Sequence, residues 1–90
     1  MLERRVVVGA KVGLHARPAA LFVQAAGRQP VAVTIAKPGA AAVDARSILS
    51  VLGLDARGGD EVVLAADGDG AEQALEELAS LVASDLDAEG

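Results

Sequence analysis

The 90-residue sequence contains no cysteine, tryptophan or tyrosine, and it has one histidine and one phenylalanine. The missing cysteines exclude disulfide bonds and a cysteine nucleophile, and they fit a reducing, cytoplasmic environment. A single imidazole cannot build a multi-histidine metal site, so no metal is expected. Because Phe22 is the only aromatic side chain, the core must be built from valine, leucine, isoleucine and alanine.

Long apolar runs are also missing. Near the start of the chain, only Val6 to Val8 form a continuous apolar stretch, which is too short for a signal-peptide core or a membrane span. The expectation is therefore a cytoplasmic protein without membrane insertion. The length suits one small domain over residues 1–90, with residues 85–90 as a frayed tail.

Basic residues are absent from the last third of the chain. All eight lysines and arginines lie in residues 1–57, whereas ten of the 13 acidic residues lie in residues 58–90. This asymmetry could steer the basic part of the molecule toward an acidic partner surface. The acidic part could equally serve solubility alone, and both interpretations stay open. No basic stripe with aromatic stacking residues exists, so nucleic acid is not an expected partner.

The one histidine lies in the octet Gly13-Leu14-His15-Ala16-Arg17-Pro18-Ala19-Ala20, directly before a run of helix-forming residues. The first turn of a helix has unpaired N–H groups and a partial positive charge, and phosphate binds readily there. Pro18 suits a helix start, because its missing N–H falls among donors that have no partner at that point. The octet therefore predicts an imidazole at the mouth of an anion-binding helix.

Three residues of this octet form the candidate catalytic site. His15 is predicted to accept a phosphoryl group, and the backbone N–H groups of Ala16 and Arg17 are expected beside its ring to bind phosphate. The Arg17 side chain adds a cation that can bridge phosphate oxygens. The alternative is that a lone histidine serves as a cap or loop residue with a structural hydrogen bond.

The hydrophobic pattern predicts the element order βαββαβα. Strands are expected at residues 4–9, 31–36, 41–44 and 60–66, and helices at residues 16–27, 46–54 and 70–84. Ser47 is a plausible N-cap of the second helix, Gly27 suits a left-handed residue that ends the first, and Asp69 to Glu72 has the pattern of a capping box. This order in so short a chain favours an α+β fold with one antiparallel sheet and helices packed on a single face.

The octet resembles the active-site signature of HPr, the histidine-containing phosphocarrier family of the bacterial phosphoenolpyruvate:sugar phosphotransferase system. Ser47, followed by a short hydrophobic helix, resembles the second signature of that family, and the likeness covers nearly the whole chain. The resemblance implies the HPr-like open-faced sandwich, in which three helices cover one face of a four-stranded sheet.

By this resemblance, the pros nitrogen (Nδ1) of His15 receives a phosphoryl group from phosphorylated enzyme I, which is charged from phosphoenolpyruvate. His15 then passes the group to sugar-specific enzyme IIA domains. The resemblance also implies a monomer that needs no cofactor and acts as a co-substrate rather than as a stand-alone enzyme.

A second function remains open, in which the chain is a regulatory or nitrogen-branch relative that acts mainly by phosphorylation-dependent protein binding. In some HPr families the serine that matches Ser47 is phosphorylated by a dedicated kinase, and the product binds a transcriptional regulator. His15 and Arg17 count against a role that depends on Ser47 alone.

The short second helix carries more large apolar residues than one face of the sheet can cover, so some are expected to stay exposed as a docking surface. The residues assigned to this surface are Ala20, Leu21, Gln24, Ile48, Leu49 and Leu52. Val51 and Leu54 are expected in the core instead.

The chain departs from the family pattern at two places. Many HPr proteins have basic residues further along the first helix, where this chain has Gln24 and Gly27, with Arg28 as the nearest candidate. Asp55 replaces a glycine that often follows the short helix, and aspartate tolerates the left-handed conformation that a glycine would adopt there.

Overall fold

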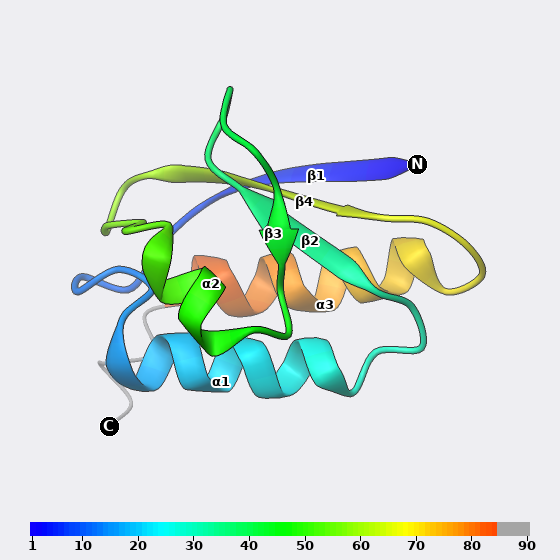
Figure 1. Ribbon diagram of the computed structural model, residues 1–90, viewed down its shortest axis with the longest axis horizontal. Helices are drawn as coiled ribbons and strands as arrows, with labels where there is room; N and C mark the ends of the chain where they lie inside the picture. The colour runs from blue at the N-terminus through cyan, green and yellow to red at the C-terminus, as the bar shows by residue number, and fades with distance from the viewer. Residues whose placement is uncertain (85–90) are drawn as a thin grey trace.

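The computed structural model describes residues 1–84, which form one antiparallel sheet with helices packed against it. Figure 1 shows α1 and α3 lying side by side beneath the strands, with the short α2 close to β3. This arrangement confirms the predicted βαββαβα order and the open-faced sandwich. No helix in the described part of the chain is long and apolar enough to cross a membrane.

The sheet has the strand order β1-β4-β2-β3, and every neighbouring pair is antiparallel. The strands are β1 (Leu2–Val7), β2 (Val33–Ala36), β3 (Val43–Asp44) and β4 (Glu61–Ala66). The central strand β4 pairs with β1 over its full length, from Leu2 opposite Ala66 to Val7 opposite Glu61. β1 is an edge strand, and most of its side chains are exposed, including Leu2 and Val7.

The three helices are α1 (Ala16–Gly27), α2 (Ile48–Gly53) and α3 (Ala71–Ala83). The bounds of α1 agree with the prediction, and Ser47 caps α2 as predicted, because its Oγ accepts a hydrogen bond from the Ser50 N–H at 3.3 Å. The cap satisfies a donor that the helix start leaves unpaired.

Two predictions about helix ends were wrong. Gly27 is the last residue of α1 rather than a left-handed residue beyond it, and Arg28 follows with right-handed helical angles. The capping box at Asp69 does not form, because Gly70 takes the N-cap position with φ +90° and has no side chain to cap with. A Cβ at Gly70 would lie 3.0 Å from Cγ of Pro30, so the chain enters α3 against a neighbouring turn that the local pattern did not reveal.

Apart from α1, each strand and helix has at least one bound that differs from the predicted one, by one or two residues. The first strand begins and ends two residues earlier, because Gly9 already leaves the sheet and its N–H donates to the Val82 carbonyl at the end of α3. The hairpin strands are shorter than predicted. They are joined by a turn at Lys37 to Ala40, in which Gly39 has φ +80° as a type II turn requires. The frayed tail predicted at residues 85–90 lies outside the described residues.

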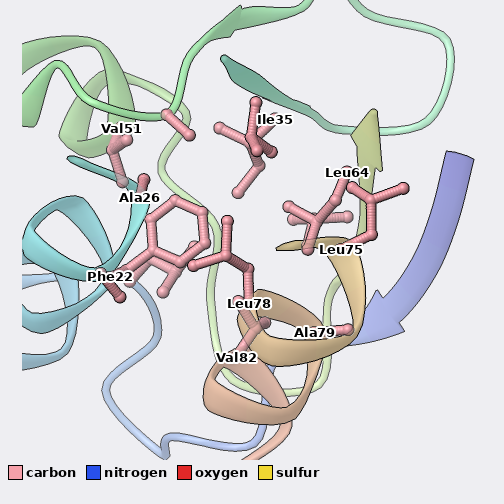
Figure 2. Close-up of a cluster of buried hydrophobic side chains, with 14 of the residues drawn as sticks. Phe22, Ala26, Ile35, Val51, Leu64, Leu75, Leu78, Ala79 and Val82 are labelled. Atoms are coloured by element: carbon pink, nitrogen blue, oxygen red, sulfur yellow. The ribbon is translucent and has the colours of Figure 1, made fainter. Parts of the chain in front are cut away.

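The core lies between the sheet and the helices and is built almost entirely from aliphatic side chains, as the composition predicted. Figure 2 shows Phe22 and Ala26 of α1 grouped with Val51 of α2 and Leu78 of α3. Val51 is fully buried, as expected, whereas Leu54 is half-buried and packs against the edge of the core. The many buried alanines let the helices approach one another and the sheet closely.

Two loops cross at one end of the sheet and hold the octet in place. The Leu14 N–H donates to the Ala56 carbonyl at 2.8 Å, and both of these side chains are buried. A Cβ at Gly13 would lie 2.2 Å from the Ala56 carbonyl oxygen, and one at Gly58 would lie 2.7 Å from the Ala10 carbonyl oxygen. The two backbones therefore approach each other so closely that only glycine, which has no Cβ, fits at these two positions.

Gly13→Ala is expected to lower the free energy of unfolding by roughly 2–4 kcal/mol, because the added methyl group overlaps backbone atoms and the residue has φ +79°. The matched control is Gly27→Ala, where a Cβ meets nothing within 4 Å in a helical backbone, and where stability should rise by up to about 1 kcal/mol. Denaturant unfolding of both variants measures the difference. Equal stabilities would contradict the proposed close contact between the loops.

Candidate functional site

His15 occupies the N-cap position of α1, with φ −128° and ψ 160°. Its side chain makes no capping hydrogen bond, and 39% of that side chain is exposed. A purely structural capping role therefore has no support from this geometry. The ring stands instead at the open start of a 12-residue helix, where the first backbone N–H groups lack acceptors within the helix.

Ala16, the first residue of α1, has φ +48° and lies in the left-handed region. An alanine there costs about 1–2 kcal/mol, and such strain persists only where the surrounding structure imposes it. The buried Leu14 on one side and the buried Pro18 on the other supply that constraint. The regular helix start expected from the sequence is thus distorted directly beside the histidine.

The Nε2 atom of His15 lies 3.3 Å from Oδ1 of Asp55. Asp55 follows α2 and has φ +52°, so it adopts the left-handed conformation in place of a glycine. The second carboxylate oxygen, Oδ2, accepts from the Arg57 guanidinium at 3.2 Å. The sequence singled out Asp55 only as a departure from the family pattern. Its contact with His15 was missed because the two residues are 40 positions apart.

Arg17 lies on the exposed surface of the first turn of α1. Among residues 1–84 its side chain has no hydrogen bond or ion pair. A guanidinium with no protein partner in the described part of the chain can move to meet an arriving anion. Ala16 is exposed as well, and its side chain is a single methyl group.

The six residues assigned to docking fall on adjacent parts of α1 and α2, which pack against each other. Leu49 is 79% exposed and Ile48 39%, although both are large and apolar. Gln24 is exposed as well, whereas Ala20, Leu21 and Leu52 are half-buried. We call these six residues the α1–α2 patch. The structure thus leaves apolar groups of α2 uncovered, as the counting argument predicted.

Two further predictions concern Ser47 and metal binding. The Ser47 hydroxyl is half-buried and already bonded to the Ser50 N–H, at the border of the α1–α2 patch. Within the described residues, no group of three or more histidine, cysteine or acidic side chains could hold a metal ion.

Comparison with known proteins gives consistent matches. The family described as "PTS HPr component phosphorylation site" matches residues 2–84. The phosphocarrier protein HPr of Streptomyces coelicolor is 60% identical over 87 residues, which are 97% of this chain and 94% of that protein. The HPr-like protein Crh of Bacillus subtilis is 43% identical over 86 residues, which are 96% of this chain and all of that protein. The crystal structure of HPr-C-His from Thermoanaerobacter tengcongensis superposes with a TM-score of 0.88 at 38% identity, covering 97% of each chain.

Ala16→Gly is expected to leave the free energy of unfolding unchanged or to raise it by up to about 1 kcal/mol, because glycine relieves the positive φ but loses more chain entropy on folding. The matched control is Ala20→Gly, within the regular part of the same helix, which should lose about 1 kcal/mol. Thermal or denaturant unfolding separates the two. A loss at Ala16 as large as that at Ala20 would argue against the left-handed conformation.

Proposed function

Because the chain belongs to the HPr family, we propose that it carries phosphoryl groups within a phosphotransferase system. In this proposal phosphorylated enzyme I, charged from phosphoenolpyruvate, donates to His15, and His15 donates to sugar-specific enzyme IIA domains. The protein acts as a monomeric co-substrate that is phosphorylated and dephosphorylated in turn. The 60% identity with a phosphocarrier protein over nearly the whole chain supports this assignment.

The single observation that carries the proposal is the placement of the His15 ring. The ring is exposed at the start of α1, and its Nε2 atom faces Asp55, whereas no described residue makes a hydrogen bond or ion pair with Nδ1. Nδ1 is therefore the ring nitrogen without a protein partner among the described residues, and its lone pair is the one proposed to attack. Nucleophilic attack requires such an uncommitted lone pair close to groups that receive the transferred charge.

The surroundings of the ring supply those groups. The N–H groups of Ala16 and Arg17 lie at the positive end of the helix dipole, and Arg17 adds a mobile guanidinium. In the proposed reaction these donors stabilise the phosphoryl oxygens as the group moves from donor to acceptor. Their exposure keeps the stabilisation moderate, which onward transfer to the next protein requires.

A regulatory function is the second candidate, and the similarity to Crh over the full length of that protein supports it. Here a kinase would phosphorylate Ser47, and the new charge would lie at the border of the α1–α2 patch, where it changes which proteins can dock. A regulator that binds the phosphorylated form would then be the partner. The exposed His15 and Arg17 favour the carrier function as the principal one.

His15→Ala should abolish phosphoryl acceptance and change the free energy of unfolding by less than about 1 kcal/mol, because the ring is outside the core. The measurement uses labelled phosphoenolpyruvate, enzyme I from the same host, and each IIA domain of that host as a final acceptor. Label that remains bound to the variant at another residue would refute the assignment of His15. A large loss of stability would instead favour a structural histidine.

Leu49→Ser should raise the apparent KM for this protein in the enzyme I reaction several-fold and hardly change its stability, because the leucine is 79% exposed. The matched control is Leu78→Ser, a fully buried leucine, which should cost roughly 2–4 kcal/mol of stability. Kinetics and denaturant unfolding are measured on both variants. If Leu49→Ser unfolds the protein but transfers normally when folded, the α1–α2 patch is not a docking surface.

A further inference from the structure

Asp55 presents one carboxylate oxygen to each of two side chains. Its Oδ1 lies 3.3 Å from Nε2 of His15, and its Oδ2 accepts from the Arg57 guanidinium at 3.2 Å. A carboxylate held at one oxygen can direct the other toward a histidine ring. The position of this residue in space is therefore suited to orienting the imidazole.

The carboxylate keeps its negative charge under ordinary conditions. The hydrogen bond from Arg57 is the main cause that holds the pKa of the Asp55 carboxyl below its usual range, and the charges of Arg57, Lys37 and His15 act in the same direction. An ionised carboxylate can only accept hydrogen bonds. The ring nitrogen that faces it is thus favoured in its protonated form, as Nε2–H.

Backbone hydrogen bonds bring the two residues close together. Leu14, next to His15, donates its N–H to the carbonyl of Ala56, next to Asp55, at 2.8 Å. The loop that carries Asp55 is closed by a further turn, in which the Arg57 N–H donates to Oδ2 of Asp60 at 3.0 Å and the Asp60 N–H donates to the Arg57 carbonyl at 2.9 Å. The contact between ring and carboxylate therefore follows from ordered backbone on both sides.

The solvent exposure of His15 and Asp55 limits how much their contact can stabilise the fold. The His15 side chain is 39% exposed and the Asp55 side chain 55%, and ion pairs open to solvent contribute little to stability. A contact of this kind acts through orientation rather than through folding energy. Its effect should therefore appear in the chemistry of the ring and not in the stability of the protein.

We propose that Asp55 is a positioning residue for His15, which accepts the Nε2–H of the ring and so fixes the tautomer that leaves the Nδ1 lone pair free to attack phosphorus. The effect of this role on phosphoryl transfer rests on the proposed phosphocarrier function, but the tautomer of the His15 ring is a property of the free protein. Arg57 assists by holding Oδ2, so that Oδ1 stays directed at the ring.

The step balances without an added base. The bond between phosphorus and the donor group of phosphorylated enzyme I breaks, and its electron pair stays on that donor group. A bond between phosphorus and Nδ1 of His15 forms from the Nδ1 lone pair, and Nε2 keeps its proton. The His15 ring gains positive charge in this step, and the Asp55 carboxylate lies directly beside the nitrogen that shares it. The opposite tautomer would present an N–H to phosphorus and could not attack from Nδ1.

The test compares the wild type with Asp55→Gly, which removes the carboxylate and suits the left-handed backbone at this position. The ¹⁵N chemical shifts of the His15 ring are measured at a pH at which the ring is neutral. They should report mainly Nε2–H in the wild type and a clear increase of Nδ1–H in the variant. The kcat/KM for phosphoryl acceptance from enzyme I should fall about tenfold, the lower end of the range for groups that orient a histidine.

The matched control is Asp67→Asn, which removes the same charge at the other end of β4 and should change neither the tautomer nor the rate. An Asp55→Gly variant that folds but keeps the wild-type tautomer overturns the positioning role, whatever its rate. Equal losses of rate in Asp55→Gly and Asp67→Asn would overturn it as well, by indicating a general charge effect. If the wild type accepts no phosphoryl group, the proposed function fails, and the tautomer comparison alone then decides the role of Asp55.

Discussion

The hydrogen bond from the Leu14 N–H to the Ala56 carbonyl is the constraint on which the site depends. It joins the loop before α1 to the loop after α2, and these loops are far apart in the sequence. Gly13 and Gly58 allow the approach, because any side chain there would overlap a carbonyl of the other loop. His15 directly follows Leu14 in the chain, and Asp55 directly precedes Ala56, so each lies next to one end of this hydrogen bond. The site is thus a product of backbone contact between loops, and the sheet and helices serve to bring those loops together.

The same contact explains why a strained residue is found where it is. Leu14 is tied to Ala56 and buried, and Pro18 is buried one turn further on, so the chain between them has little freedom. Ala16 absorbs the mismatch by adopting φ +48°. A small, exposed residue in a rare conformation directly beside the candidate phosphoryl acceptor is the pattern expected where geometry is imposed for function rather than for stability.

Much of the fold could be predicted from the sequence, because the signals that set it are local. Apolar periodicity identified α1 with its bounds, and Ser47 marked the start of α2 as its cap. The octet also placed His15 directly before α1 and Arg17 in its first turn, because residue type and helix position are local signals, and the phosphate site there stays a prediction. Predictions failed where contacts between residues far apart in the sequence decide the geometry. Gly70, which lies against Pro30, replaced the predicted cap of α3. Loop packing sets the conformation of Ala16 and brings Asp55 to His15, and no periodicity in the sequence encodes that packing.

The proposed carrier site must satisfy two opposed demands, and the proposal assigns them to different groups. Acceptance needs a nucleophile whose lone pair and ring orientation are set in advance, and here the ordered elements are the backbone around Leu14 and the Asp55 carboxylate held by Arg57. Release needs a product that is not held too firmly. The groups proposed to meet the phosphoryl oxygens are accordingly exposed, and Arg17 must lose conformational freedom whenever it binds. In the proposed reaction, a fixed ring orientation combined with loose stabilisation of the oxygens would lower the barrier in both directions without deepening the intermediate state, because only interactions stronger in the transition state speed transfer.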